Sequence, residues 1–337
     1  MEEEERATPL PQPPHSQGWI VSPVFDLLFL ANLGWPLLLL ARNTQGDTSI
    51  DFWQIYFLSL PHRWVTMVLV LTDSDRRDGR GWKLTGIAVL SAAIVIGAYF
   101  GTGAFLCLAL VDYVWNAWHF GSQHAGVLRM YARKVGGGSP WLERWGLRGF
   151  VTYAGVRAAA WATGAMKADP DALYWLHAVD FAVLLIPIAM LLSNLAGAGR
   201  ERLGKLAYLS SVCLLYTGMV LSQRFGWARL FLVFIASGSM FHAIEYLAIV
   251  THYARRRETV GSDSRFRVLA RHWLVFLGLY ILILGSAGAW MARPDSGLLM
   301  LWVGLNLWAS FVHYAYDGMI WKLRRPATAA ALGVGTP

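Results

Sequence analysis

Charged residues are scarce in this chain. Asp, Glu, Lys and Arg together make up 15% of its 337 residues, against about 25% in an average soluble domain. Hydrophobic residues reach 56%, and the mean hydropathy is +0.42. This balance excludes an ordinary water-soluble domain and indicates a polytopic membrane protein.

Cysteine is scarcer still. Cys107 and Cys213 both lie inside hydrophobic segments and form no CxxC pair, so neither a disulfide framework nor a thiolate zinc site is indicated. The basic and aromatic pattern of a nucleic-acid-binding protein is also missing, and no nucleic-acid partner is expected. The net charge of +8 is better explained by loops that set membrane topology and contact anionic membrane lipids.

The apolar stretches recur at the length of about 20 residues that crosses a bilayer as a helix. We therefore expect an all-α fold with about ten transmembrane helices, built as one domain over residues 21–325. The acidic, proline-rich residues 1–20 have no apolar core behind a basic start, which predicts a disordered tail instead of a signal peptide. Residues 326–337 are expected to form a flexible tail. The spans are predicted near 22–42, 51–72, 84–102, 103–128, 149–166, 172–196, 206–224, 227–252, 273–292 and 297–321.

Basic residues gather in alternate loops, around Arg76, Arg133, Arg202, Arg256 and Lys322. The positive-inside rule then predicts that both termini are cytoplasmic. The expected location is the inner (cytoplasmic) membrane of a prokaryote. Every even-numbered span runs toward the cytoplasm in this topology, so spans 2, 4, 8 and 10 are parallel.

These four spans each carry a histidine: His62, His119, His242 and His313. Each histidine stands 9 to 14 residues before the first basic residue of the following loop. At about 1.5 Å per helical residue, this places all four imidazoles roughly 13–21 Å from the cytoplasmic charges. Parallel helices with histidines at one depth predict a metal site in the core of the bundle.

Polar residues accompany these histidines at helical spacing. On span 4, Asp112, Asn116 and Gln123 share the face of His119, whereas His124 points about 140° away from it. Glu245 and Tyr246 follow His242, and Asp317 follows His313. The candidate metal ligands are His62, His119, His124, His242, Glu245, His313 and Asp317. The candidate catalytic residues, which include groups able to orient the imidazoles, are Asp112, Asn116, Gln123 and Tyr246.

A plainer interpretation exists for any single histidine, which can simply form a hydrogen bond between helices. Four at one depth with acidic neighbours favour a functional site, because an ionisable group at mid-bilayer costs at least roughly 2.5–3.5 kcal/mol. Arg157, inside span 5, is interpreted as an anchor that snorkels to the interface, with a partner role for an acidic residue as the alternative.

Short motifs in the same order resemble the Brp/Blh family of membrane-embedded β-carotene 15,15′-dioxygenases. The motifs are Leu60-Pro61-His62, His119-Phe120-Gly121, His242 and the pair His313 and Asp317. The resemblance implies an iron ion held by histidines and a carotenoid-like substrate. It assigns His62, His119 and His242 as ligands.

Three positions depart from the family pattern. Thr66 stands where the family has Asp, His124 replaces another Asp, and Tyr246 replaces the second histidine of a helical pair. The fourth ligand therefore stays open among His124, Glu245 and His313.

Imidazoles with carboxylates suit Fe(II), which can bind dioxygen if one position is open. We expect a non-haem oxygenase or oxidase with one or two Fe(II) ions, using O2 and a hydrophobic substrate such as a carotenoid, isoprenoid or lipid. Two alternatives are a bis-histidine haem b electron-transfer protein and a metal-free proton-coupled transporter. The sequence indicates no oligomeric state.

Overall fold

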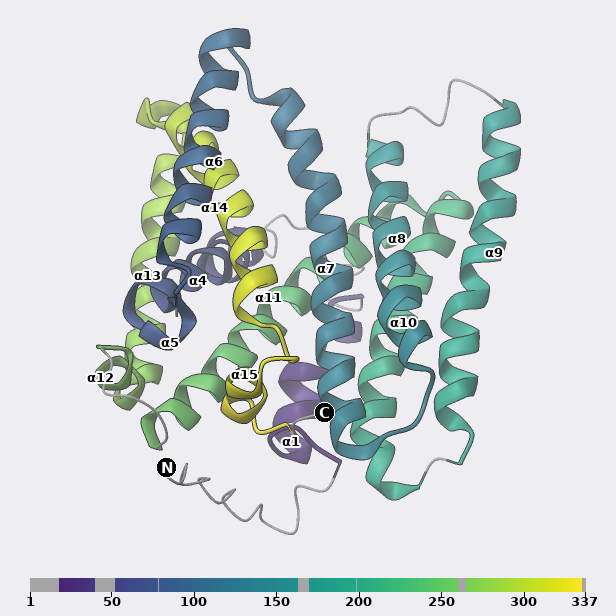
Figure 1. Cartoon of the computed structure of the whole chain (residues 1–337). Helices are drawn as coiled ribbons and strands as arrows, with labels where there is room; N and C mark the ends of the chain where they lie inside the picture. Colours follow the sequence, from purple (N-terminus) through teal and green to yellow (C-terminus); the bar gives the residue numbers. More distant parts are fainter. Residues whose placement is uncertain are drawn as a thin grey trace.

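The computed structural model describes residues 18–39, 52–77, 79–162, 170–197, 199–259 and 265–334. All regular structure within these ranges is helical, which confirms the predicted all-α class (Figure 1). Residues 1–17 of the predicted N-terminal tail and residues 335–337 lie outside the described ranges.

Most of the chain is in long helices joined by short turns and short irregular helices. The elements are α1 (Pro23–Phe25), η2 (Asp26–Leu30), η3 (Gln54–Ser59), α4 (Leu60–Thr72), α5 (Ser74–Arg77), α6 (Gly81–Thr102), α7 (Leu106–Val135), η4 (Leu142–Gly146), α8 (Leu147–Ala162), α9 (Pro170–Leu195), η6 (Arg200–Arg202), α10 (Leu203–Arg224), α11 (Ala228–Thr259), α12 (Arg265–Arg271), α13 (Trp273–Met291), η7 (Pro294–Ser296), α14 (Leu299–Ile320) and α15 (Pro326–Ala331).

Within the described part of the chain, six helical stretches are long and apolar enough to cross a membrane, by length and composition. They are Gln54–Thr72, Gly81–Thr102, Tyr174–Leu195, Arg200–Arg224, Ala228–Arg257 and Trp273–Met291. Helices α7 and α14 are comparably long but contain more polar and aromatic residues. The structure thus supports a membrane protein, while the number of ten spans stays a prediction.

Helix α11 crosses obliquely through the middle of the bundle (Figure 1). Helices α6, α13 and α14 lie on one side of it, and α8, α9 and α10 lie on the other, with α7 between the two groups. Helices α7 and α14 run in the same direction and finish toward the end of the molecule that carries α5 and α15. We call this the basic end, because Arg76, Arg133, Arg256 and Lys322 follow or close the helices there.

Helices α7 and α8 approach each other closely through glycines. A Cβ atom at Gly121 would lie 2.8 Å from the carbonyl oxygen of Arg148, and one at Gly155 would meet the side chain of Ala117 at 2.5 Å. Small residues at such contacts let membrane helices pack backbone to backbone. This contact sets the rotation of α7 and hence the direction of its polar face.

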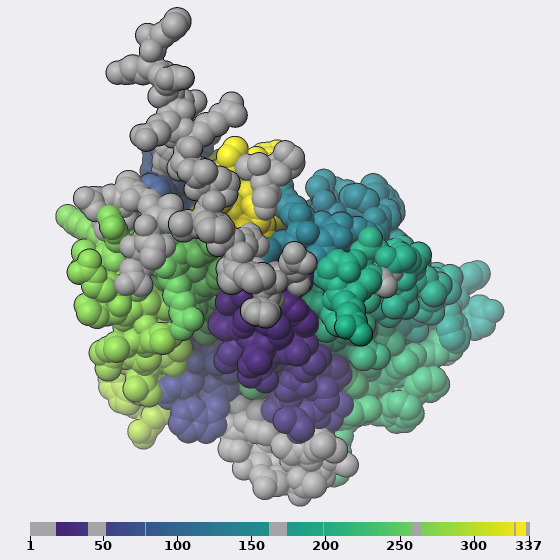
Figure 2. Space-filling model, turned by 90° about the horizontal axis from the view of Figure 1, so that it is seen from below, coloured from purple at the N-terminus to yellow at the C-terminus, as the bar shows by residue number. Residues whose placement is uncertain are grey.

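The C-terminal segment is ordered against the basic end. The sequence predicts a flexible tail from residue 326, but Pro326–Ala331 form α15, and Ala329, Leu332 and Val334 are buried. The guanidinium of Arg76 is also buried there and donates to the carbonyl oxygen of Ile320 and to Thr328. Residues 326–334 are ordered instead of flexible because their apolar side chains are buried against the basic end. Figure 2 shows this yellow segment and the purple N-terminal elements on the same face.

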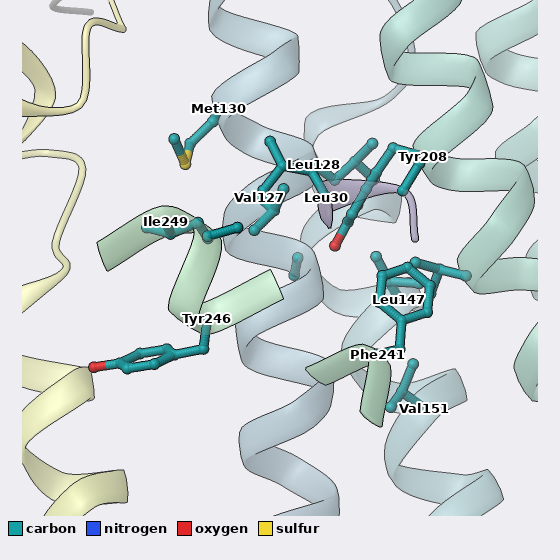
Figure 3. Close-up of a cluster of buried hydrophobic side chains, with 14 of the residues drawn as sticks. Leu30, Val127, Leu128, Met130, Leu147, Val151, Tyr208, Phe241, Tyr246 and Ile249 are labelled. Atoms are coloured by element: carbon teal, nitrogen blue, oxygen red, sulfur yellow. The ribbon is translucent and has the colours of Figure 1, made fainter. Parts of the chain in front are cut away.

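Buried apolar residues fill the space among α7, α8, α10 and α11, including Leu128, Tyr208 and Phe241 (Figure 3). Tyr246 leaves the opposite side of α11 from Phe241 and points toward α14. Helix α11 therefore separates an apolar core from a polar region that it shares with α14.

Arg157 lies inside the bundle, 2% exposed. Its guanidinium donates from two nitrogens to the two carboxylate oxygens of Asp180, each at 3.0 Å. The interpretation of Arg157 as a snorkelling anchor is therefore wrong, because its charge is paired between α8 and α9. The pairing of Arg157 with Asp180 could not be predicted from the sequence.

Candidate metal centre

Four histidine rings meet where α4, α7, α11 and α14 come together. The ring centroids of His62 lie 4.9 Å from His242 and 5.1 Å from His313, and those of His119 lie 5.0 Å and 4.7 Å from the same two rings. None of the four residues is more than 6% exposed. The structure thus joins histidines separated by up to about 250 residues into one buried cluster.

Local structure directs two of these rings. Pro61 opens α4 directly after the π-helical turn η3, and the phenol of Tyr280 donates to the carbonyl oxygen of Pro61 at 3.0 Å. The irregular turn and the proline set the angle at which His62 enters the bundle. Phe120 stacks on the ring of His242, with centroids 3.9 Å apart and planes 20° from parallel, and so limits its rotation.

Nitrogen atoms in this cluster lack hydrogen-bond partners among the described residues. They are His62 Nδ1, His119 Nε2, both ring nitrogens of His242, and His313 Nε2. A buried polar atom left unsatisfied costs about 1–3 kcal/mol. Several such atoms close to one another could together hold a cation.

The described residues contain two groups of three potential ligand atoms, and within each group the atoms lie within 4.8 Å of one another. One comprises His62, His242 and His313, and the other comprises His119, His313 and Asp317. Carboxylate Oδ2 of Asp317 lies 3.6 Å from His313 Nε2 and 3.8 Å from His119 Nε2. His313 belongs to both groups, so they form one continuous cluster.

Thr66 orients His313 and Asp317. Its hydroxyl lies 2.7 Å from His313 Nδ1 and donates to Asp317 Oδ1 at 3.3 Å. The phenol of Tyr246 donates to the same Oδ1 at 2.7 Å. We assign the proton of His313 to Nδ1, as the donor to Thr66, which leaves Nε2 as an acceptor facing the cluster. Thr66 and Tyr246 thus both donate to Oδ1 of Asp317, while Oδ2 lies nearer the histidines.

His124 and Glu245 form a separate network. His124 Nδ1 lies 2.9 Å from Glu245 Oε2 and 3.0 Å from the phenol of Tyr208, and His124 Nε2 lies 3.3 Å from the phenol of Tyr216. Tyr208 also donates to Glu245 Oε2 at 3.1 Å. Both nitrogens of His124 therefore have partners, and neither residue belongs to the two groups above.

Gln123 connects the two clusters. Its amide nitrogen donates to the carbonyl oxygen of His242 at 3.0 Å and to Glu245 Oε1 at 3.3 Å. Asp112 is farther along α7 and accepts a hydrogen bond of 3.1 Å from the phenol of Tyr314, whose ring packs 4.8 Å from that of His119. Asn116 is half-buried on the same helix.

Sequence reasoning did not assign roles to Arg63 or Tyr314. Arg63 directly follows His62 and interacts electrostatically with Asp112 and with the ring of His119. An arginine in the middle of an apolar segment was an available signal. In the sequence, Thr66 stands out only as a departure from a motif. In the structure, its hydroxyl contacts His313 and Asp317.

A pocket of about 830 Å³ reaches this cluster between α7 and α14. His119, Tyr246 and Asp317 line it, together with Trp118 and Tyr314. A molecule bound there would contact the histidine and the carboxylate that lie nearest the pocket.

Comparisons of the chain with family models, curated proteins and solved structures found no match in any of the three.

Proposed function

We propose that the chain is an integral membrane non-haem iron oxygenase or oxidase that uses O2 on a hydrophobic substrate. The observation that carries the proposal is the set of buried imidazole nitrogens that face one another without hydrogen-bond partners among the described residues. His62, His119, His242 and His313 would hold the ion, and Asp317 Oδ2 lies beside them.

The donor set favours Fe(II). Neutral imidazoles and a carboxylate suit this ion, whereas structural zinc sites commonly use thiolates, and Cys213 lies outside the cluster. The rings favour a bare ion over a haem, because centroids only 4.7 Å apart leave no room for a porphyrin between His119 and His313. With its Nδ1 directed at Thr66, His313 has one nitrogen to offer, which favours one ion over two.

The bound ion would supply a redox-active centre with an open position for dioxygen, and the substrate would supply the electrons that reduce the dioxygen. The surrounding residues have separate tasks. Thr66 and Tyr246 hold Asp317 by its Oδ1. Phe120 excludes water from the face of His242. The pocket between α7 and α14 allows a lipophilic molecule to approach His119.

The likeness of the motifs to Brp/Blh dioxygenases supports this class of reaction. Thr66, His124 and Tyr246 differ from that family's pattern, and Thr66 and Tyr246 bond directly to the cluster. We therefore do not extend the retinal-forming reaction to this chain. The proposal includes ten membrane spans, cytoplasmic termini and the inner membrane of a prokaryote. The described N- and C-terminal elements lie on the same face, which supports placing them on one side of the membrane.

Metal analysis and an absorption spectrum of the detergent-purified full chain test the proposal. We expect stoichiometric iron without a haem band, and O2 consumption when a lipophilic substrate is supplied. A haem band would support the electron-transfer alternative. Protein that is folded yet free of metal, and that gains none when Fe(II) is added anaerobically, would refute the oxygenase and favour the proton-coupled transporter.

A further inference from the structure

The pocket between α7 and α14 has a strongly basic rim. Among the described residues, six basic residues line it, and Asp317 is the only acidic residue that does. The six are Arg129, Arg133, Arg144, Arg148, Lys322 and Arg324. Glu143, which is not among the lining residues, pairs with Arg129 at 3.1 Å. Arg129 is thus paired, and no ion pair to a carboxylate is found for Arg144, Arg148, Lys322 or Arg324 among the described residues.

Arg148 is held in place for binding. Its guanidinium carbon lies 5.2 Å from the ring centroid of Trp145 and 5.7 Å from that of Trp118. Its Nε has no hydrogen-bond partner among the described residues. Aromatic faces support a guanidinium while leaving its in-plane donors available to an anionic oxygen.

The charges at the other side of the rim remain close to one another. Burial, followed by the charges of Arg324, Arg325 and Arg80, lowers the pKa of Lys322, which follows the last turn of α14. Positive charges thus lie close enough to Lys322 to disfavour its protonated form. An anionic ligand would relieve the repulsion.

Part of the remaining lining is apolar and aromatic. Trp115 and Tyr314 line it near His119, and Met130 and Ile249 line it farther along α7 and α11. A purely hydrocarbon ligand would fill this part but would cover the arginines without pairing them. A small free anion would pair the arginines but leave the apolar wall empty.

We propose that the pocket binds an anionic amphiphile, with its phosphate or carboxylate head at Arg144, Arg148 and Lys322 and its apolar part against His119 and Asp317. This inference rests on the proposed function, because it makes the amphiphile the substrate of the oxygenase. It points to lipid acids or prenyl phosphates and away from uncharged carotenoids.

Binding of dodecyl phosphate to the full chain in a neutral detergent tests the inference, with native mass spectrometry as the readout. The protein is first treated with a chelator, so that the result does not depend on iron. We expect one dodecyl phosphate per chain and at least tenfold weaker binding of dodecanol. Laurate tests the carboxylate head, inorganic phosphate tests the head alone, and phosphatidylglycerol tests a bulk lipid.

Two kinds of variant distinguish binding in the pocket from binding elsewhere on the protein surface. Arg144→Gln combined with Arg148→Gln removes charge from the rim, and Lys83→Gln is the matched control on exposed α6. Gly126→Leu fills the pocket, because a Cβ there meets nothing within 4 Å, and Gly97→Leu makes the same change in open space on α6. We expect a tenfold or greater loss of affinity in the two pocket variants and no change in the two controls.

Several results would overturn the inference: equal binding of dodecanol, full competition by inorganic phosphate at the same concentration, or undiminished binding in Gly126→Leu. Phosphatidylglycerol that binds as tightly and is insensitive to Gly126→Leu would identify a surface lipid site instead. Because the protein is metal-free, an iron-free preparation would refute the proposed function without changing these outcomes.

Discussion

His119 and His124 stand five residues apart on α7, and both are buried, yet their surroundings are opposite. His119 Nε2 has no hydrogen-bond partner among the described residues, and its ring lies against the imidazoles of His242 and His313. His124 has a partner for each ring nitrogen, supplied by Glu245, Tyr208 and Tyr216. A buried histidine whose ring nitrogens both have hydrogen-bond partners can hold helices together. A cluster of histidines with unpartnered nitrogens could instead bind a ligand. The difference can be tested with matched substitutions.

The largest expected effect is loss of the metal from His242→Leu. This change removes two unpartnered nitrogens from the cluster, so metal content falls to background while the metal-free protein keeps its stability. Iron analysis and thermal unfolding of the purified variant measure both quantities. His124→Leu is the control and keeps its iron. If His242→Leu retained stoichiometric iron, His242 would not be a ligand.

The second effect is on stability alone. His124→Leu leaves the Glu245 carboxylate and two tyrosine hydroxyls short of a partner inside the bundle, which costs about 3 kcal/mol of unfolding free energy. Unfolding in a denaturing detergent measures the loss. A variant as stable as the parent would mean that the network around His124 does not hold α7 to α10 and α11.

A smaller effect is expected where Thr66 orients the cluster. Thr66→Val keeps the shape of the side chain but removes its contacts to His313 and Asp317, which lowers metal affinity by about 10- to 100-fold. Competition with a chelator measures the affinity. Thr152→Val is the matched control, because the hydroxyl of Thr152 has no partner among the described residues. Equal losses in both variants would assign the effect to packing.

The smallest effect concerns the link between the two clusters. Gln123→Leu removes the hydrogen bonds to the His242 carbonyl and to Glu245, at a cost of about 1 kcal/mol. Gln223→Leu is the control, since the Gln223 amide is buried without a partner among the described residues. In a double-mutant cycle with His124→Leu, the two changes should not be additive. Strict additivity would show that the clusters are independent.

Much of this arrangement follows from helix geometry. The rise per residue and the basic loops indicate a common depth for His62, His119, His242 and His313, and the turn per residue directs His124 away from His119. Both inferences depend only on spacing along single helices. The all-α class follows in the same way from the length of the apolar segments.

Contacts between helices could not be obtained in this way. Nothing along the chain links His124 to Tyr208 and Tyr216, or Arg157 to Asp180, because such pairs depend on how α10 and α9 pack. His124 and Glu245 lie outside the two groups of potential ligands and bond to each other and to Tyr208 of α10, a contact that the sequence does not reveal. Residues 326–334 are ordered because they pack on a surface that other helices form.

The close contact of α7 with α8 at Gly121 and Gly155 leaves the two walls of the pocket unequal in mobility. The α7 wall packs closely against α8 at these glycines, which leaves α7 little room to move toward α8. The other wall, α14, has open space beside Gly318. In the proposed enzyme, a wide substrate would displace α14 more readily than α7, and with it His313 and Asp317. The spectrum of a bound ion would then change when the pocket is occupied, before any chemistry begins.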